Sequence, residues 1–347
     1  MKEALAPAID LHMDRLALGI TDAFYARHPE WEQRFGPRGR IRCVEDARFH
    51  LRFLRGALRA GAPSAFESYA RWTNGVLGAR GIGGAHLAFY FELMQAELTT
   101  VLGDEAKPAA PFIAAGIAAC QAPARAEVAQ PDARDSTRDE YLDAVLSGRR
   151  ADALAVATRA ADTGWAHTEL YSGLFTRSQH RLGELWQANR ISVAQEHMAS
   201  AITQWVAANL YPRLLRPRQP IGKALLFGVE GELHQLGVQF MADVLELEGW
   251  SVIFLGTNTP TAAALVTIDE HRPDVVGVAA TMLFSLPAAL DAVAEIRRRQ
   301  PELPVVVGGR AFADAADACR EAGVIGVAGS LESGRTLVAG VAAARAV

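Results

Sequence analysis

The spacing of apolar residues changes once along the chain. Up to about residue 215 the apolar positions recur at intervals of three and four, as in Phe53, Leu54 and Leu58, which is the period of a helix with one buried face. After the segment RPRQP at 216–220, short apolar runs alternate with helical patterns of about ten to fifteen residues. This alternation predicts a parallel, doubly wound sheet with helices on both faces.

The helical part divides into three segments. Residues 1–120 are predicted to form an all-α domain, in which turn signals such as Gly61-Ala62-Pro63 separate the helices. Residues 121–137 are rich in Ala, Pro and charge without an apolar period, which is typical of a linker. Residues 138–215 are expected to form a small bundle of three or four helices. The capping-box pattern Ser192–Gln195 begins its last helix.

Residues 221–347 are assigned to a Rossmann-like, flavodoxin-like α/β domain. In such a sheet, ligands bind beyond the carboxyl ends of the strands. The predicted strands are Ala224–Val229, Val252–Leu255, Val275–Ala279, Val305–Val307 and, as a weaker fifth, Val324–Val327.

Composition and charge narrow the function classes. Half of the 347 residues are apolar, 21% are charged and the net charge is −4, which is ordinary for a globular protein and gives no footprint of direct nucleic-acid binding. Acidic residues and His12 interrupt any signal-peptide core near the start, and the apolar runs are shorter than a membrane span. We therefore expect a cytoplasmic protein. Its three widely spaced cysteines predict neither a disulfide framework nor a zinc site.

Polar and small residues follow three of the predicted strands. Glu232, His234 and Gly237 follow the first, Thr281 and Leu283 the third, and Gly308-Gly309 the fourth. Taken singly, each has an ordinary explanation. A histidine there is commonly a surface residue, Gly-Gly a turn, and a threonine a helix cap. The first loop also lacks the glycine patterns of dinucleotide and phosphate loops.

In this order the residues resemble the cobalamin-binding domain of the methionine synthase and mutase class, with its D-x-H-x-x-G, S-x-L and G-G pattern. Glu232 stands for the usual Asp and Thr281 for the usual Ser. The resemblance implies that His234 ligates cobalt from below through a neutral imidazole, while Glu232 accepts a hydrogen bond from the other ring nitrogen. A ligand-free flavodoxin-like domain is the alternative. The resemblance implies that Gly237, Gly308 and Gly309 leave room for the buried benzimidazole tail and that Thr281 hydrogen-bonds it, with Leu283 as a further cofactor-binding position.

The helical bundle carries a second pattern, Trp186 followed after nine residues by Glu196-His197. It resembles the W-x9-E-H-H signature of the adenosylcobalamin light receptors that regulate bacterial carotenoid genes. The resemblance implies that Trp186 covers the adenosyl group, with Glu196, His197 and the apolar Val193 beside it. The alternative is a core tryptophan with an exposed Glu–His pair.

The sequence departs from that family at three points. Met198 replaces the final His, and Gln187 follows the tryptophan where well-known members have a His that can ligate cobalt after photolysis. A light state with two histidine ligands is therefore not implied. The N-terminal helix-turn-helix of those receptors is not recognisable either.

The first helical segment is faintly globin-like. His50 and His86 are candidates to face a tetrapyrrole lined by Tyr69, Trp72 and Phe89. The alternative is that the aromatic residues are ordinary core and both histidines are partly exposed helix residues. A helical domain joined to cobalamin modules resembles photocobilins, which pair B12 with a bilin. That resemblance implies biliverdin, bound covalently through Cys43 or non-covalently, with haem as the competing occupant.

These patterns together predict a cobalamin photoreceptor rather than an enzyme. Light would break the cobalt–carbon bond of adenosylcobalamin, and the bundle would shift against the Rossmann-like domain. The readout would be light-dependent homo-oligomer assembly or a downstream regulator protein. One alternative is a corrinoid methyl carrier or mutase subunit that works with a separate substrate subunit. Another is a B12 or haem sensor that binds a transcriptional regulator equally in darkness and light.

Overall fold

The computed structural model describes residues 2–121, 135–216 and 218–345. They divide between two compact units. The first contains helices α1 to α6 together with the segments 282–290 and 311–321. The second contains helices α7 to α10 and the rest of the α/β domain, including its sheet.

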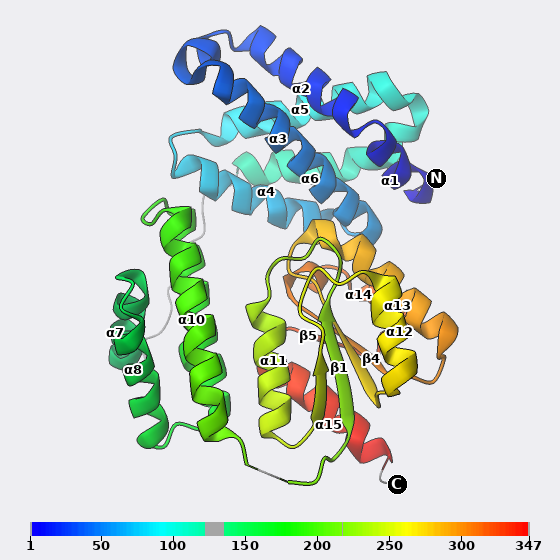
Figure 1. Ribbon diagram of the computed structural model, residues 1–347. Coiled ribbons are helices and arrows are strands. Elements are labelled where there is room, and N and C mark those ends of the chain that lie inside the picture. The colour runs from blue at the N-terminus through cyan, green and yellow to red at the C-terminus, as the bar shows by residue number, and fades with distance from the viewer. Residues whose placement is uncertain (1, 122–134, 217, 346–347) are drawn as a thin grey trace. The chain divides into compact units, whose positions relative to one another are not determined.

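The first unit confirms the predicted all-α N-terminal domain (Figure 1). Gly61 adopts a φ of +71° after α3, and Pro63 is the first residue of α4, so the predicted turn ends one helix and starts the next. The helices are α1 (Lys2–Leu11), α2 (Met13–Arg27), α3 (Glu30–Ala60), α4 (Pro63–Gly78), α5 (Gly84–Leu102) and α6 (Ala110–Gln121), with the 3-10 segment η1 (Gly103–Ala109).

The second unit begins with the helical bundle. The predicted capping box is confirmed, because Ser192 Oγ accepts from the Gln195 N–H at 3.2 Å and Gln195 Oε1 accepts from the Ser192 N–H at 2.9 Å. Of the expected linker, residues 122–134 lie outside the described residues, and α7 begins at Asp135. The elements are α7 (Asp135–Leu146), α8 (Arg150–Asp162), the π-helical segment η2 (Glu169–Thr176), α9 (Arg177–Gln187) and α10 (Val193–Leu214).

The α/β fold is confirmed as a five-stranded parallel sheet with the order β2-β1-β3-β4-β5 (Figure 1). Helices α11 (Leu236–Leu247) and α15 (Leu331–Arg345) pack on one face, and α12 (Thr261–His271) and α13 (Leu286–Arg299) lie on the other. The shorter α14 (Ala316–Glu321) follows β4. The strands are β1 (Lys223–Gly228), β2 (Ser251–Phe254), β3 (Val275–Ala279), β4 (Val305–Gly308) and β5 (Gly326–Ala328).

The bundle and the sheet domain share one hydrophobic core. Phe240, Val244 and Leu247 of α11 are buried in the same cluster as Tyr171 and Phe175 of the bundle. Removing this apolar surface from water fixes α10 beside α11. Polar pairs border the cluster, since Tyr211 donates to Glu246 at 2.6 Å and Gln204 donates to Gln239 at 2.9 Å.

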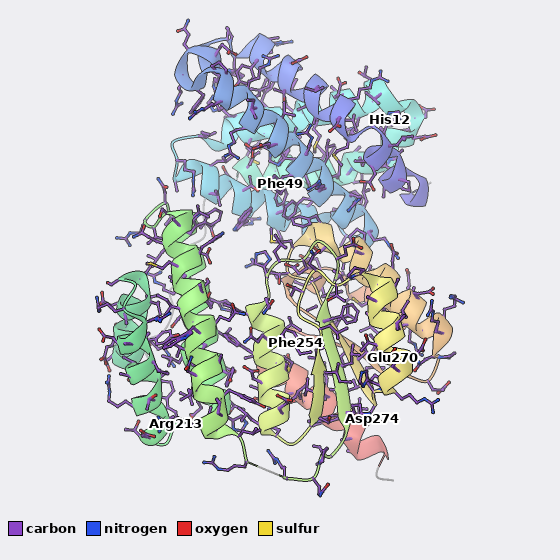
Figure 2. The ribbon with its side chains drawn as sticks, viewed as in Figure 1. His12, Phe49, Arg213, Phe254, Glu270 and Asp274 are labelled. Carbon is purple, nitrogen blue, oxygen red and sulfur yellow. The ribbon has the colours of Figure 1, made fainter. Side chains whose placement is uncertain are left out.

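The end of the sheet at which the strands begin is marked by Asp274, which accepts a hydrogen bond from the Lys223 N–H at 2.8 Å. Near the end of α10, Arg213 pairs with Asp162 at 3.0 Å. Figure 2 shows Arg213 and Asp274 toward the same end of the second unit. Helix α10 therefore begins toward the end at which the strands finish, where ligands bind in such sheets. None of the described helices combines the length and apolar composition that spanning a bilayer requires.

One carboxyl at the contact between the bundle and α11 predicts a pH-dependent stability. Asp243 accepts from the Tyr171 hydroxyl at 3.0 Å. Burial raises the pKa of Asp243 to about 6, and the nearby Glu246 charge adds to the rise while the Tyr171 hydrogen bond opposes it. The folded protein thus retains a proton that the unfolded chain releases between about pH 4 and pH 6, so stability falls as pH rises through that window.

Replacing Asp243 with asparagine removes this ionisation and keeps an acceptor for Tyr171. We expect the free energy of unfolding to rise by about 1 to 2 kcal/mol near pH 7 and to stay unchanged near pH 4. Denaturant unfolding at both pH values tests this, with the exposed Asp139→Asn as a control. An equal effect at the two pH values would contradict the assignment.

Candidate functional site

In the loop after β1, the side chain of Glu232 is buried whereas that of His234 is exposed. Gly231 adopts a φ of +82°, a conformation that glycine reaches without strain, and its N–H donates to Asn258 Oδ1 at 2.8 Å. The Glu232 N–H donates to the Val229 carbonyl at 3.0 Å and closes the turn. Glu232 is consequently 1% exposed, whereas the His234 side chain is 55% exposed. The imidazole is available to a ligand while its carboxylate partner is not.

The buried carboxylate is fully engaged. Glu232 Oε1 lies 2.5 Å from His234 Nδ1 and accepts from the His234 backbone N–H at 2.9 Å. Glu232 Oε2 accepts from the Thr281 N–H at 2.6 Å. The predicted contact between Glu232 and one ring nitrogen is thus present despite the longer side chain. Because Nδ1 donates to the carboxylate, the neutral ring has its lone pair on Nε2, which is the atom that can bind a metal.

These contacts shift both ionisations toward an ion pair. Burial alone would raise the pKa of Glu232, but the hydrogen bonds from His234 and Thr281 outweigh it and lower that pKa to about 2. The hydrogen bond with Glu232 raises the pKa of His234 against the opposing effect of burial. The charges of Glu232 and Glu196 add to that rise.

The other positions of the loop pattern differ in their surroundings. A Cβ at Gly237 would meet open space, whereas one at Gly309, which has a φ of +109°, would overlap the Ala280 carbonyl. Thr281 contacts Glu232 through its backbone N–H, and the proposed contact of its side chain with the tail stays a prediction. Gly308 ends β4. Leu283 opens the 3-10 segment η3 (Leu283–Ser285) and belongs to the first unit.

A tight turn joins the two halves of the bundle pattern. Trp186 lies in the last turn of α9, and its carbonyl accepts from the Asn189 N–H at 3.0 Å. Val193 is the first residue of α10. Glu196 Oε2 lies 2.5 Å from His197 Nδ1, and Glu196 Oε1 accepts from the Ser200 hydroxyl at 2.8 Å. Glu196 therefore contacts Ser200 of the bundle as well as His197, which distinguishes it from an isolated exposed Glu–His pair.

The first turns of α10 and the loop after β1 present unusual apolar exposure. Leu233 is 77% exposed, Val193 is 55% exposed and Met198 is 37% exposed. Leu233 directly precedes His234, and Val193 and Met198 lie within one helical turn of Glu196. An imidazole nitrogen with exposed apolar neighbours and open space at Gly237 suits a large, partly apolar metal complex. Among the described residues, no group of three or more His, Cys, Asp or Glu side chains could hold a bare metal ion.

The N-terminal candidates fall into two aromatic groups. His50 is 5% exposed, and its Nδ1 lies 2.7 Å from the Tyr69 hydroxyl; Trp72 lies beside Tyr69, with 6.3 Å between ring centroids. His86 and Phe89 instead gather around His28, each with 5.4 Å between ring centroids.

The surroundings of the N-terminal candidates bear on their chemistry. Burial lowers the pKa of His50 to about 3, so this ring is neutral. Because His50 is buried, the alternative that it is a partly exposed helix residue is wrong, whereas His86 is partly exposed. Burial also raises the pKa of the Cys43 thiol, which disfavours the thiolate needed for covalent attachment. Cys43, Cys120 and Cys319 are free.

Two further residues belong to the site and were missed from the sequence. Ser200 lies one helical turn after Glu196, and Gln179 lies two turns before Trp186 on α9. These spacings place each on the same helix face as a candidate residue. That signal alone does not reveal that Ser200 and Gln179 meet, which depends on how α9 packs against α10.

Comparison with known proteins identifies two domains. Residues 222–341 match the family model of the B12 binding domain, and residues 137–210 match a second model with the same description. Both the sheet domain and the bundle are therefore B12-binding domains, and they indicate a cobalamin cofactor.

Two curated relatives match parts of the chain. The HTH-type transcriptional repressor CarA of Myxococcus xanthus is 32% identical over 120 residues, which cover 35% of this chain and 41% of the repressor. The methionine synthase of Mycobacterium tuberculosis is 24% identical over 135 residues, covering 38% of this chain and 11% of the synthase. The matches thus span less than half the length of either relative.

A solved structure supports the fold. The monomethylamine corrinoid protein of Methanosarcina barkeri superposes with a TM-score of 0.53 at 18% identity. The match covers 59% of this chain and 98% of that protein. At this identity the likeness bears on the fold alone.

Proposed function

Starting from the two B12-binding domains, we propose that the chain is a light-sensing regulator that binds adenosylcobalamin between the loop after β1 and the first turns of α10. The observation that carries the proposal is the Glu232–His234 pair, in which the buried carboxylate holds Nδ1 at 2.5 Å and leaves Nε2 of the exposed ring to a ligand. His234 would supply the lower ligand and the helical bundle the upper cap, and both belong to the second compact unit. The W-x9-E-H pattern supports the adenosyl form.

Each residue group has a distinct role in the proposal. His234 Nε2 would bind cobalt, while Glu232 holds the ring through Nδ1. The benzimidazole tail would run past Gly237, with Thr281, Gly308 and Gly309 lining its path. Trp186 would cover the upper ligand, with Val193, Glu196 and His197 beside it. When bound, adenosylcobalamin supplies a cobalt–carbon bond that light breaks.

Loss of the upper ligand would change the packing of the bundle. Trp186 and Glu196 would lose a partner that held them over the sheet domain. The bundle meets α11 through polar pairs such as Tyr171–Asp243 as well as apolar contacts, and packed contacts between elements can have two discrete arrangements. A shift at this contact would alter self-assembly or the binding of a regulator protein, so the output is regulatory rather than enzymatic.

The N-terminal domain would hold a second chromophore, biliverdin, with haem as the rival. The neutral, buried His50 beside Tyr69 and the group of His86 and Phe89 support a tetrapyrrole site. The raised pKa of Cys43 favours non-covalent binding. Titration with biliverdin tests this part separately, because binding would add a red absorption band that His50→Ala diminishes.

Light-dependent assembly tests the proposed function. The wild-type protein, loaded with adenosylcobalamin in darkness, is expected to change its oligomeric state after green light. The double variant Trp186→Ala with His234→Ala is expected to show no light-dependent change, because both faces of the cofactor lose their contact. Size-exclusion chromatography with light scattering measures the change, and the exposed His271→Ala is the control. Retained light-dependent assembly in the double variant would contradict the proposal.

A corrinoid methyl carrier is the second candidate. The stretch aligned with methionine synthase favours it. This reading predicts that the protein is isolated with a methylated cofactor and that light leaves its assembly unchanged. A ligand sensor would instead show cobalamin-dependent association that is the same in darkness and in light.

A further inference from the structure

One row of small residues crosses the carboxyl end of the sheet. Strand register places these residues side by side, in the order Gly228, Ala279, Gly308 and Ala328. Residues paired in this way point to the same face of a sheet. Ala279 and Ala328 pack against the hydrophobic cluster that the sheet forms with α11 and α15. This small-residue row therefore faces those two helices.

Space remains between the small-residue row and the helices. Ala279 and Ala328 are partly exposed although they lie on a helix-covered face, whereas Val307 on the opposite face is fully buried. A Cβ at Gly308 would meet Ala328 at 3.5 Å and no atom of a described helix within 4 Å. The row is thus covered by the helices without being in contact with them at Gly308.

The side chain of Met241 lies at the inner part of this space. Met241 comes one helical turn after Gly237 on α11, so it lies deeper along the proposed path of the tail. A Cβ at Gly334 of α15 would overlap the Met241 methyl group and lie 3.2 Å from the Cβ of Ala328. The methyl group therefore occupies the room that the absence of a side chain at Gly334 leaves beside the small-residue row.

We propose that Met241 determines which lower base this domain accepts, because its side chain yields to an apolar benzimidazole and disfavours a purine. This inference rests on the proposed function and deepens it by naming the chemistry that the tail must have. Methionine suits the role, since its unbranched chain and polarisable sulfur adapt to irregular space. The methyl group can move aside when a tail enters and keeps an apolar surface against it.

The groups around Met241 offer a tail only apolar side-chain contacts. Ala328 and Gly334 have no polar side-chain atom. Leu337 of α15 limits the depth of the space, since a Cβ at Gly326 of β5 would overlap it. Dimethylbenzimidazole turns ring carbons and methyl groups toward such a surface. An adenine base would instead bury an amino group and ring nitrogens without partners, which costs binding free energy.

Dissociation constants measured in darkness compare cobalamin with its analogue that carries adenine as the lower base, both with the same upper ligand. The wild-type protein is expected to bind cobalamin about 10- to 100-fold more tightly, which is the discrimination typical of an apolar site against a more polar analogue. Met241→Gln places an amide donor and acceptor in a side chain of similar length and is expected to reduce this preference about tenfold. Met241→Leu stays apolar and is expected to retain it.

Gly334→Ala tests the space itself. The added methyl group would displace the end of Met241 toward the small-residue row, so cobalamin should bind at least about tenfold more weakly. Cobinamide, which has no lower base, should bind as it does to the wild type. Gly340→Ala is the matched control, because it adds the same group to α15 at a position where a Cβ meets open space.

Methionine methyl groups report the contact directly. The chain has six methionines, and Met241→Leu identifies the Met241 methyl signal in NMR spectra of the labelled apoprotein. Cobalamin is expected to shift this signal, because an aromatic base would lie beside the methyl group, and cobinamide is expected to leave it nearly unchanged. Thermal unfolding shows which variants fold normally.

The outcomes separate the inference from the function on which it rests. A wild-type protein without preference for cobalamin, an unmoved Met241 signal, or a folded Met241→Gln protein with the wild-type preference overturns the role of Met241 alone. Failure of the wild type to bind any of the three corrinoids overturns the proposed function and the inference with it. Selective cobalamin binding that light leaves unchanged overturns only the light-sensing function. Loss of the preference in Met241→Gln but not in Met241→Leu supports the inference.

Discussion

His234→Ala is expected to lower the affinity of the protein for cobalamin by at least about 100-fold. Loss of a residue that merely supports a metal ligand typically costs about 10- to 100-fold, and His234 is the proposed ligand itself. Its Nε2 is directed by the contact between Nδ1 and Glu232 at 2.5 Å. Absorbance titrations in darkness measure the dissociation constant.

Glu232→Gln provides the graded comparison. The amide oxygen can replace only one of the two carboxylate oxygens as an acceptor. The NH2 group therefore faces either the His234 ring or the Thr281 N–H, whose hydrogen bond Glu232 Oε2 accepts at 2.6 Å in the wild type. A loss of about 10- to 100-fold is expected. The exposed neighbour Glu230→Gln is expected to bind as the wild type does. Unchanged affinity in His234→Ala would show that cobalt takes its lower ligand from elsewhere.

Two glycines of the same pattern are expected to respond in opposite ways. Gly237 has open space where a Cβ would be, so Gly237→Val should alter the free energy of unfolding by less than about 1 kcal/mol. It would fill the proposed path of the tail and lower cobalamin affinity at least about tenfold. Gly309 has a φ of +109° and no room for a Cβ beside the Ala280 carbonyl. Gly309→Ala should therefore destabilise the fold by about 2 to 4 kcal/mol.

Thermal unfolding and cobalamin titration of both variants separate the two roles. The expected pattern is a normal melting temperature with weak binding for Gly237→Val, and a lowered melting temperature for Gly309→Ala. Tight cobalamin binding by a folded Gly237→Val protein would place the benzimidazole tail elsewhere.

The sequence predicts most of the sheet domain because each strand is a nearly continuous apolar run. The predicted strand Val275–Ala279 coincides with β3, and the other strands differ by one or two residues at their ends. The Glu232–His234 contact was predictable as well, since the two residues sit two positions apart in one loop. Local patterns suffice where the interacting groups are neighbours in sequence.

Features that depend on packing between elements were not predictable. The hydrogen bond from the Thr281 N–H to Glu232 joins loops 49 residues apart. Its donor is a backbone N–H, which every residue except proline has, so the residue type at position 281 does not indicate the contact. The meeting of Gln179 with Ser200 requires the register of α9 on α10. Burial of His50 against Tyr69 likewise depends on how α3 packs on α4, which helical periodicity alone does not fix.

The central claim is that this chain uses cobalamin to sense light, and an absorption spectrum tests it most directly. Protein loaded with adenosylcobalamin in darkness and freed of excess cofactor would be scanned before and after green light. We expect a bound cobalamin spectrum that converts on illumination in the wild type and is absent in His234→Ala. A bound cobalamin whose spectrum survives green light unchanged would contradict the account.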